Sequence, residues 1–556
     1  MFRNWPLGEL QNEIGTENLE LFEYIIPRVS DDDDFESFVG NKRKLASLVE
    51  NLKDHDYYRD KRNLIKALNY ISNEDLHGLF TTLQLDAHST EREMLAKKIL
   101  SNVKSYEKFI EYFQIDSRFL AEPPVKLPAY FDNVPPSSAN PKSISKPYKT
   151  LKNYQYQCMS DATALLEHNM SRSLLQMPTG SGKTRTSSEI IAQHLNEFSE
   201  KPRQVVWLAN TRELCEQAIQ CMVEVWDHVG LKQCRFNRLW DGNLKKIEDW
   251  RDNGCTFTVG SLQTLHSILT NQPDYFMDLF RNTTLAIVDE AHIAVAPTYS
   301  EVIRNITRSS RCKILGLTAT PKRNDFDGTS ALSDLFFNQI ASLEDPDKRR
   351  KNTIAYLRSL GVMSEAFHQE IQHHATVDLT DSQRASIKNG NDIPQKVLDQ
   401  LGADFERTVS IILGLRNLLE QGAKIIYFAP SVQNSFVVSA ILNFLDFKSV
   451  HVSSDTSPRM RDTLIDGFKN DKFQILCNYG VLATGFDAPK IDVVCIGRPT
   501  MSPVLYSQMI GRGMRGPKVG GTEQCVILEV TDNFIGLGTQ DLLYKQFQEY
   551  WAEDVN

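Results

Sequence analysis

The segment MPTGSGKT, residues 177–184, lies between two stretches of different character. The short apolar run SLLQM at 173–177 leads into it, and TRTSSEIIAQHL at 184–195 follows it with apolar residues at helical spacing. An apolar run, a glycine-containing turn and an amphipathic helix are typical of one repeating unit of a parallel α/β sheet. The segment therefore predicts a strand, a tight loop and a helix, in that order.

The loop of this unit has the residue types that hold phosphate groups. Gly180 and Gly182 allow backbone N–H groups to curl around an anion, because a Cβ atom would obstruct the approach. Lys183 can reach the β- and γ-phosphates of a nucleotide, and the Thr184 hydroxyl can join a Mg²⁺ shell. The following helix would direct its N-terminus at the phosphates. The predicted nucleotide-binding residues of the loop are Thr179, Gly180, Ser181, Gly182, Lys183 and Thr184.

Other short runs of β-branched residues alternate with amphipathic segments along the chain. A first series occupies 205–209, 257–260, 285–290 and 313–320, and a second occupies 424–430, 473–477, 493–497 and 525–530. This alternation predicts an α/β fold with parallel strands and crossover helices. The two series could form two similar domains.

The run LAIVDEAH, residues 285–292, ends a predicted strand with two carboxylates. The carboxyl edge of a parallel sheet is where such folds bind ligands. Asp289 can therefore hold Mg²⁺, and Glu290 can orient and deprotonate the water that attacks a phosphate. The four letters alone are equally typical of an acidic turn that caps the next helix. Their position one series of strands after GSGKT favours the chemical interpretation.

The N-terminal part of the chain has a different pattern. Residues 41–121 have apolar positions at helical spacing and little glycine, which predicts an all-α region. Residues 122–148 contain seven prolines and predict a linker without a regular element. Segment 71–100 predicts helix, loop and helix, with Asn73 as the cap of the first helix. This segment faintly resembles the SAP DNA-binding motif, but we favour a docking or autoinhibitory role for the helical region.

Composition excludes several classes of protein. The 556 residues are 41% hydrophobic and 24% charged, which excludes fibrous and wholly disordered chains. No apolar run approaches the ~18 residues of a membrane span, and no basic start precedes an apolar core, so we expect neither a membrane segment nor a secretory signal. The nine cysteines form no CxxC pair, which predicts a reducing, cytoplasmic location. The net charge of −9 lacks the basic footprint of many nucleic-acid binders.

Between residues 150 and 535 the chain resembles a superfamily 2 helicase-type motor of the DExH kind, because the motifs of that family occur in the family's order. The matching segments are LKNYQ (151–155), GSGKT (180–184), LANTREL (208–214), TVGSLQTL (258–265), DEAH (289–292), GLTATP (316–321), ATGFDAP (483–489) and QMIGRGMR (508–515). The resemblance implies ATP and Mg²⁺ as cofactors. DNA-repair motors and the motor subunits of restriction systems are the nearest kin that it suggests.

The resemblance also implies two tandem RecA-like parallel-sheet domains behind an N-terminal all-α domain. The predicted segments are 1–121, an accessory helical domain with an acidic start at 1–40; 122–148, the linker; 149–325, RecA-like domain 1; 326–375, a connector; 376–540, RecA-like domain 2; and 541–556, a C-terminal helix.

Roles around the γ-phosphate follow from the same resemblance. Arg515 is implied as an arginine finger, Arg512 as a second phosphate contact, and Gln508 as a positioner of water or phosphate. The spacing of three between the arginines predicts that they share one face of a helix. Two helix arginines are otherwise typical of a solvated face, and the surrounding motifs favour the catalytic interpretation.

Further roles concern the base, the sugar and the coupling of hydrolysis to movement. Gln155 is implied to face the adenine edge, and Asp487 to lie near the sugar or the arginine pair. His292, Thr318 and Thr320 are implied as coupling residues, although a single histidine is more often a satisfied core residue.

Small polar residues at predicted strand ends are implied as contacts to a nucleic-acid backbone. They are Asn210, Thr211, Arg212, Ser261, Gln263, Ser431, Ser453, Thr484 and Gly485. Any one of the serines and threonines is equally typical of a helix cap or a turn. Contacts of this kind predict binding that tolerates different sequences and weakens with salt.

We therefore expect an ATP-dependent nucleic-acid translocase or helicase, with DNA favoured over RNA. One alternative is a nucleic-acid-activated ATPase switch that signals to a partner through residues 1–121, as a defence or restriction system would need. An RNA helicase is the other.

Overall fold

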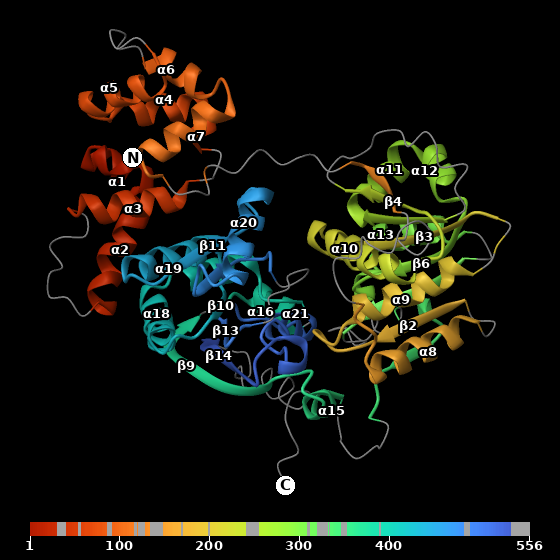
Figure 1. Cartoon of the computed structure of the whole chain (residues 1–556). Coiled ribbons are helices and arrows are strands. Elements are labelled where there is room, and N and C mark those ends of the chain that lie inside the picture. The colour runs from red at the N-terminus through yellow and green to blue at the C-terminus, as the bar shows by residue number, and fades with distance from the viewer. Residues whose placement is uncertain are drawn as a thin grey trace.

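The computed structural model describes residues 1–30, 40–53, 57–85, 92–115, 119, 128–133, 148–167, 171–197, 199, 201–240, 255–308, 312–319, 332, 334–345, 353–377, 379–388, 391–482 and 490–534. They form a helical N-terminal domain and two α/β lobes (Figure 1). The N-terminal domain, called here the accessory domain, contains α1 (Leu7–Ile14), α2 (Thr16–Val29), α3 (Lys42–Leu52), α4 (Lys61–Asn69), α5 (Asn73–Thr82), α6 (Arg92–Ile99) and α7 (Val103–Tyr112).

Lobe 1 is an eight-stranded sheet with the order β1-β4-β5-β3-β6-β7-β2-β8. Its strands are β1 (Tyr130–Asn133), β2 (Arg172–Gln176), β3 (Arg203–Ala209), β4 (Cys234–Leu239), β5 (Cys255–Ser261), β6 (Thr283–Val288), β7 (Lys313–Thr318) and β8 (Ile340–Ser342). Its helices are α8 (Asn153–Glu167), α9 (Lys183–Asn196), α10 (Arg212–Val229), α11 (Leu262–Asn271), α12 (Pro273–Phe280) and α13 (Pro297–Ile306).

Lobe 2 is a six-stranded sheet with the order β11-β12-β10-β13-β14-β9, all parallel. Its strands are β9 (Glu365–Val377), β10 (Ile425–Phe428), β11 (Ser449–Val452), β12 (Ile475–Asn478), β13 (Val493–Ile496) and β14 (Gln524–Phe534). The accompanying helices are α15 (Thr353–Ser359), α16 (Asp381–Lys388), α17 (Gln395–Ala403), α18 (Phe405–Glu420), α19 (Val432–Phe444), α20 (Pro458–Lys469) and α21 (Pro503–Ile510).

The predicted fold class is confirmed: two parallel sheets follow an N-terminal set of helices. The central strands are buried on both faces, which is why they read as continuous apolar runs. Parallel pairing places Leu208 of β3 beside Val288 of β6, so the ends of the two strands meet at one sheet edge. That edge holds the acidic pair that follows β6.

Three local expectations are wrong. The proline-rich stretch 122–148 contains a regular element, since β1 pairs antiparallel with β4 at the edge of the first sheet. The expected connector 326–375 contains β8 of the first sheet and most of β9 of the second. Ser72, not Asn73, caps α5, because the Ser72 hydroxyl accepts the N–H of Asp75 at 3.0 Å.

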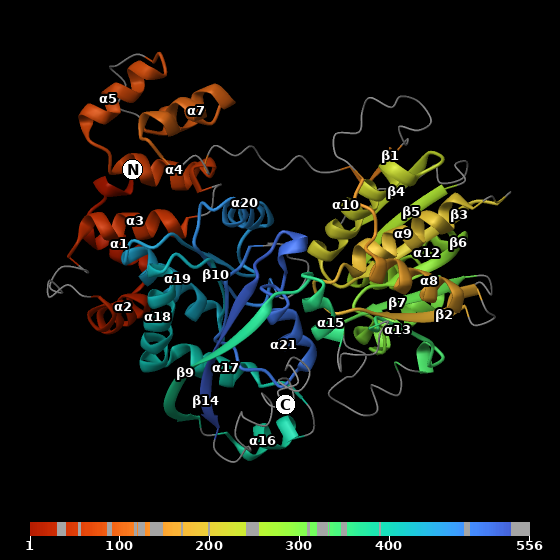
Figure 2. The same ribbon diagram turned by 60° about the horizontal axis from the view of Figure 1, so that its bottom comes forward.

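The accessory domain packs against lobe 2, although the chain continues from it into lobe 1 (Figures 1 and 2). Apolar residues of both units form one buried cluster. The Tyr24 and Phe405 rings lie 4.9 Å apart, and Arg416 donates to the Val29 carbonyl at 2.8 Å. These contacts seat the accessory domain on lobe 2.

A buried ion pair stabilises lobe 2. The fully buried Arg407 donates to the two carboxylate oxygens of Asp532 at 2.6 and 2.8 Å and to the Gly497 carbonyl at 2.7 Å. We expect Arg407→Ala to lower the free energy of unfolding by about 3–5 kcal/mol, because it leaves an uncompensated carboxylate inside the protein. Urea unfolding followed by circular dichroism measures the change. Arg281→Ala, which removes the exposed pair with Asp278, is the control and should cost less than about 1 kcal/mol; equal losses would contradict the prediction.

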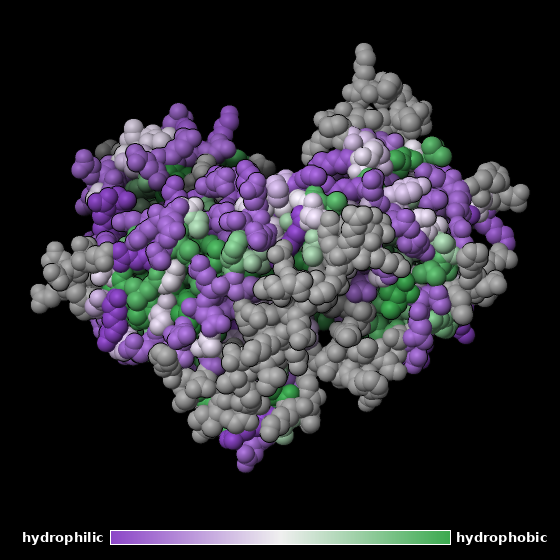
Figure 3. Space-filling model, turned by 90° about the horizontal axis from the view of Figure 1, so that it is seen from below, coloured by the Kyte–Doolittle hydropathy of each residue, from purple (hydrophilic) through white to green (hydrophobic). Residues whose placement is uncertain are grey.

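The surface is mixed in hydropathy. Figure 3 shows hydrophilic residues interspersed with smaller hydrophobic groups on one face. Among the described residues, no helix is both long and apolar enough for a membrane span.

Candidate functional site

A cavity of about 450 Å³ lies between the two lobes. Its residues come from the glycine loop, from α10, from the acidic edge of lobe 1 and from the loops after α21 in lobe 2. They are Lys149, Pro178, Thr179, Gly180, Gly182, Lys183, Thr184, Arg185, Leu214, Gln217, Gln220, Cys221, Glu224, Asp289, Glu290, Arg512, Arg515 and Val519. The structure thus brings the predicted lysine, carboxylates and arginines together in one place.

Residues of α8 support the glycine loop through hydrogen bonds. Gly180 and Gly182 have φ of +83° and +95°, which other residues rarely adopt. The buried Ser181 carbonyl accepts hydrogen bonds from Tyr154 Oη at 2.8 Å and from Gln155 Nε2 at 3.1 Å. Gln155 Oε1 in turn accepts the N–H of Lys152 at 2.9 Å. Both polar atoms of the Gln155 amide are therefore engaged with backbone in this structure, where they support the loop.

The acidic pair occupies the expected sheet edge. Asp289 donates its N–H to the Leu208 carbonyl of β3 at 2.9 Å, and its carboxylate accepts the N–H of Glu290 at 3.0 Å. Glu290 has a φ of +49°, so the chain turns sharply here and directs both carboxylates into the cavity. His292 lies in the next turn, with Nδ1 3.4 Å from Glu290 Oε2.

The two carboxylates differ in their affinity for a proton. Burial and the neighbouring Glu290 charge raise the pKa of Asp289 to about 7. Burial also disfavours ionised Glu290, but Lys183, His292 and Gln508 outweigh it and lower the pKa of Glu290 to about 2. Lys183, His292 and Gln508 therefore favour the ionised form of Glu290. Gln508 belongs to lobe 2, so part of the lowering of the Glu290 pKa depends on contact between the two lobes.

The arginines are presented differently from the sequence expectation. The helix α21 ends at Ile510, so the prediction that Arg512 and Arg515 share a helix face is wrong. Arg515 lies in an extended segment that pairs with Met363, and Ser364 Oγ donates to the Arg515 carbonyl at 2.6 Å. Burial lowers the pKa of each arginine to about 10, and both remain charged at neutral pH. Both still reach the cavity.

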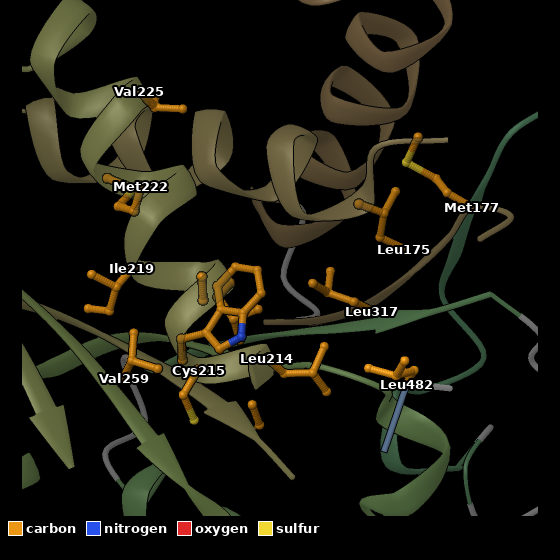
Figure 4. Close-up of a cluster of buried hydrophobic side chains, with 14 of the residues drawn as sticks. Leu175, Met177, Leu214, Cys215, Ile219, Met222, Val225, Val259, Leu317 and Leu482 are labelled. Carbon is orange, nitrogen blue, oxygen red and sulfur yellow. The ribbon is translucent and has the colours of Figure 1, made fainter. Parts of the chain in front are cut away.

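The lobes touch at the glycine loop. A Cβ built on Gly511 would lie 2.6 Å from Cγ2 of Thr179, so only glycine permits this approach. The lobes also share an apolar cluster that includes Met177 and Leu214 of lobe 1 and Leu482 of lobe 2 (Figure 4). The Lys152 ammonium donates to the Lys518 carbonyl across the boundary at 3.3 Å.

An ion pair also joins the lobes. Arg461 of α20 donates to Glu213 of α10 at 2.5 Å, and both side chains are mostly buried. We expect Arg461→Ala and Glu213→Ala each to lower kcat/KM for ATP, and a double-mutant cycle to give a coupling energy of about 1 kcal/mol, because the pair contributes only when the lobes are together.

The control for this cycle is the exposed pair Arg281 and Asp278, at the end of α12 in lobe 1. Its coupling in the same assay should be close to zero. Additive effects of Arg461→Ala and Glu213→Ala would contradict a role for their contact in closure.

Several predicted nucleic-acid residues have structural partners. Thr211, Ser261 and Ser431 are the N-caps of α10, α11 and α19. Asn210 Oδ1 accepts hydrogen bonds from Gln263 at 3.3 Å and from Tyr299 at 3.0 Å.

Some of the other predicted nucleic-acid, coupling and nucleotide residues have partners in the structure, and some lie outside the described residues. Arg212 pairs with Glu216 at 2.8 Å, and Ser453 is buried in a turn. Thr318 is buried at the end of β7, where its carbonyl accepts the N–H of Met177 at 3.0 Å. Four predicted positions lie outside the described residues: Thr320, Thr484, Gly485 and Asp487.

Sequence reasoning missed the α10 wall of the cavity, the Ser364 support of Arg515 and the ion pair between the lobes. The glutamines of α10 recur at helical spacing, but a polar helix face is usually solvated, so no signal separated them from surface residues. The partners of Ser364 and Arg461 are distant in sequence and could not be found from local patterns.

Comparison with known proteins finds two family models that match parts of this chain. Residues 148–323 match the family described as the type III restriction enzyme res subunit, and residues 407–516 match the helicase conserved C-terminal domain. A 51.5 kDa protein of a Lactococcus phage (isolate 7-9) is 28% identical over 343 residues, which cover 62% of this chain and 62% of that protein. A Saccharomyces cerevisiae protein, provisionally named the ATP-dependent helicase IRC3, is 27% identical over 380 residues, or 66% of this chain and 49% of that one.

Among solved structures, that of the DUF1998 helicase MrfA bound to DNA aligns with a TM-score of 0.50 at 15% identity, over 76% of this chain and 56% of that one. This likeness concerns the fold. The chain spans less than two thirds of the length of each of these relatives.

The fold and the cavity have the arrangement of a two-lobed, helicase-type motor, in which a phosphate loop faces arginines from a second RecA-like lobe. The two family matches confirm the predicted resemblance to the superfamily 2 motors, including those of restriction enzymes. Both parts of a helicase-type motor are matched in this chain, in agreement with the prediction of an ATP-hydrolysing enzyme.

Proposed function

We propose that the protein is an ATP-driven translocase or helicase that acts on DNA. The observation that carries this proposal is that Lys183 of lobe 1 and Arg512 and Arg515 of lobe 2 line one cavity. A triphosphate bound to the loop would meet cations from both lobes. Its hydrolysis would weaken that bridge and allow the lobes to separate.

Each charged residue has a distinct part in this proposal. Lys183 and the loop N–H groups hold the β- and γ-phosphates, and Arg515 and Arg512 stabilise the charge that develops on the γ-phosphate. Glu290 orients the attacking water with Gln508. A triphosphate that pairs with Lys183 removes part of the stabilisation of ionised Glu290, and so makes this carboxylate a better proton acceptor.

The residues of the cavity fit a Mg²⁺ ion of the nucleotide-bound kind. Thr184 offers a hydroxyl and Asp289 a carboxylate, and both line the cavity beside Lys183. Mg²⁺ commonly takes one or two protein oxygens and completes its shell with phosphate and water. Among the described residues, no three or more His, Cys, Asp or Glu side chains lie together as a metal site. Bound Mg²⁺ would neutralise charge on the β- and γ-phosphates.

The nucleic-acid substrate is proposed from the residues at the strand ends and from the relatives. Asn210, Gln263 and Arg212 lie at the carboxyl ends of strands of lobe 1, where small polar groups can contact a phosphate backbone. The match to the res subunit of a restriction enzyme supports DNA as the substrate here. All nine cysteines are free thiols, which supports a cytoplasmic location.

A panel of ATPase assays tests the proposal. Hydrolysis is measured with no nucleic acid, with single-stranded DNA, with duplex DNA and with single-stranded RNA, and movement is measured by strand displacement and by displacement of a triplex-forming strand. We expect DNA to stimulate hydrolysis and stimulation to fall as salt rises. Stimulation by RNA alone would instead identify an RNA helicase.

A second function is favoured by the packing of α2 on α18 and α19. Because the accessory domain is joined to lobe 2, closure of the lobes on nucleic acid could be passed to a partner in a defence or restriction system. In that case DNA stimulates ATP hydrolysis without any strand or triplex displacement.

A further inference from the structure

Two segments that are distant in sequence lie side by side next to the ATP cavity. Residues 511–522, between α21 and β14, carry Arg515 and are called here the arginine loop. Residues 361–364, between α15 and β9, pair with this loop and are called here the clamp segment. The clamp segment belongs to the chain that passes from lobe 1 into lobe 2. The arginine loop is thus supported at the point where the chain enters the second sheet.

Backbone hydrogen bonds join the clamp segment to both neighbours of the arginine. The Gly516 N–H donates to the Val362 carbonyl at 2.8 Å, and the Ser364 N–H donates to the Met514 carbonyl at 3.2 Å. A Cβ atom built on Gly516 would lie 2.5 Å from the Gly361 carbonyl oxygen, so only glycine permits this close approach. The path of the arginine loop is therefore closely fixed on one side.

The Ser364 hydroxyl contacts the backbone of the arginine itself. Ser364 is fully buried, and its Oγ lies 2.6 Å from the Arg515 carbonyl oxygen and 2.7 Å from the Thr522 carbonyl oxygen. The Arg515 carbonyl also accepts the N–H of Thr522 at 2.9 Å, so the hydroxyl joins the two ends of the turn that begins at the arginine. Loss of the hydroxyl would leave these carbonyls short of one donor, which favours a displaced backbone at Arg515.

The other arginine of the cavity has a different support. The N–H of Arg512 donates to the Met509 carbonyl at 3.2 Å, so the backbone of Arg512 continues the last turn of α21. Ser364 Oγ lies 3.5 Å from the Gly513 carbonyl oxygen, which is farther than its distance from the Arg515 carbonyl. Loss of the Ser364 hydroxyl should therefore displace Arg515 more than Arg512.

We propose that Ser364 is a positioning residue for ATP hydrolysis and acts through Arg515, an inference that rests on the proposed function. Ser364 lies outside the lining of the cavity, whereas Arg515 belongs to it. The hydroxyl holds the backbone from which the guanidinium extends, and Cγ of Arg515 lies 3.9 Å from a Cβ built on Gly180 of the glycine loop. A shift of ~1 Å in a reacting group can cost about 10²-fold in rate. Ser364 thus affects the chemical step more than the capture of ATP.

A double-mutant cycle in the full chain tests this inference. We expect Ser364→Ala to lower the single-turnover rate of ATP hydrolysis by roughly 10- to 10²-fold and to leave the equilibrium dissociation constant of ATP nearly unchanged. In the Arg515→Ala background, Ser364→Ala should lower the rate no further, because the group that it positions is absent. A merely structural role would lower the rate by the same factor in both backgrounds.

Two further variants separate positioning from a loss of stability. Ser439→Ala removes another buried hydroxyl of lobe 2, on α19, which accepts a hydrogen bond from Ser449 at 2.8 Å. It is the matched control: it should lower the melting temperature about as much as Ser364→Ala and leave the rate unchanged. Ser364→Cys keeps a weak donor at the same position, so its rate should lie between those of the wild type and Ser364→Ala. Should Ser364→Ala not fold, the cycle is run with Ser364→Cys.

The inference is overturned if the Ser364 variants keep the wild-type rate, if they lower the rate equally with and without the Arg515 side chain, or if they weaken ATP binding as much as they lower the rate. Failure of the proposed function gives a different result. It would be seen as unchanged turnover in Arg515→Ala, or as ATP hydrolysis that no nucleic acid stimulates, whatever the Ser364 variants do.

Discussion

Glu290→Gln should retain ATP binding and lower the rate of hydrolysis by roughly 10²- to 10⁴-fold. The amide has nearly the shape of the carboxylate but accepts no proton from the attacking water. The carboxylate lies beside Lys183 and faces His292 and Gln508, so its charge is set by both lobes. Single-turnover hydrolysis measured beside equilibrium ATP binding separates the two effects.

The neighbouring carboxylate gives the contrast for this test. Asp289→Asn should raise the Mg²⁺ concentration for half-maximal ATP binding, because Asp289 is the proposed ligand of the metal. It should also lower the rate of turnover. Glu290→Gln should leave the Mg²⁺ concentration for half-maximal ATP binding unchanged. Undiminished turnover in Glu290→Gln would remove this residue as the base.

Arg515→Ala should lower kcat roughly 10³- to 10⁵-fold, the range known for arginine fingers. A guanidinium presented from the opposite lobe contributes most in the transition state, when charge spreads over the γ-phosphate oxygens. Arg515 is held for this task by Ser364, which bonds its carbonyl, and its side chain lies near Gly180 of the loop. Rapid-quench measurement of the chemical step tests the prediction.

Arg512→Ala should have a smaller effect on kcat and a larger one on ATP binding. Arg512 interacts electrostatically with Lys183 and Glu290 in this structure, so it is part of the charge balance that receives the triphosphate. Arg498→Ala is the control, because Arg498 lies near Asp392, away from the cavity. Turnover of Arg515→Ala within threefold of the wild type would show that the catalytic guanidinium comes from elsewhere.

The sequence by itself determined the parts of this protein that depend on contiguous residues. GSGKT between an apolar run and a helix predicted the loop at 180–184, and the two series of β-branched runs predicted the parallel sheets. The carboxylates at 289 and 290 were placed correctly because the carboxyl ends of all strands in a parallel sheet lie at the same edge. In these cases the periodicity of the chain and the position of glycine set the local geometry.

The tertiary structure decided what depends on residues far apart in the chain. Arg515 is presented by pairing with Met363, about 150 residues earlier, and not by the helix that its spacing suggested. The Gln155 amide is oriented by the Ser181 carbonyl, and the accessory domain lies on lobe 2 because its apolar faces match α18 and α19. Helical spacing shows which residues of α10 share a face, but only the packing of the lobes shows that this face lines the cavity.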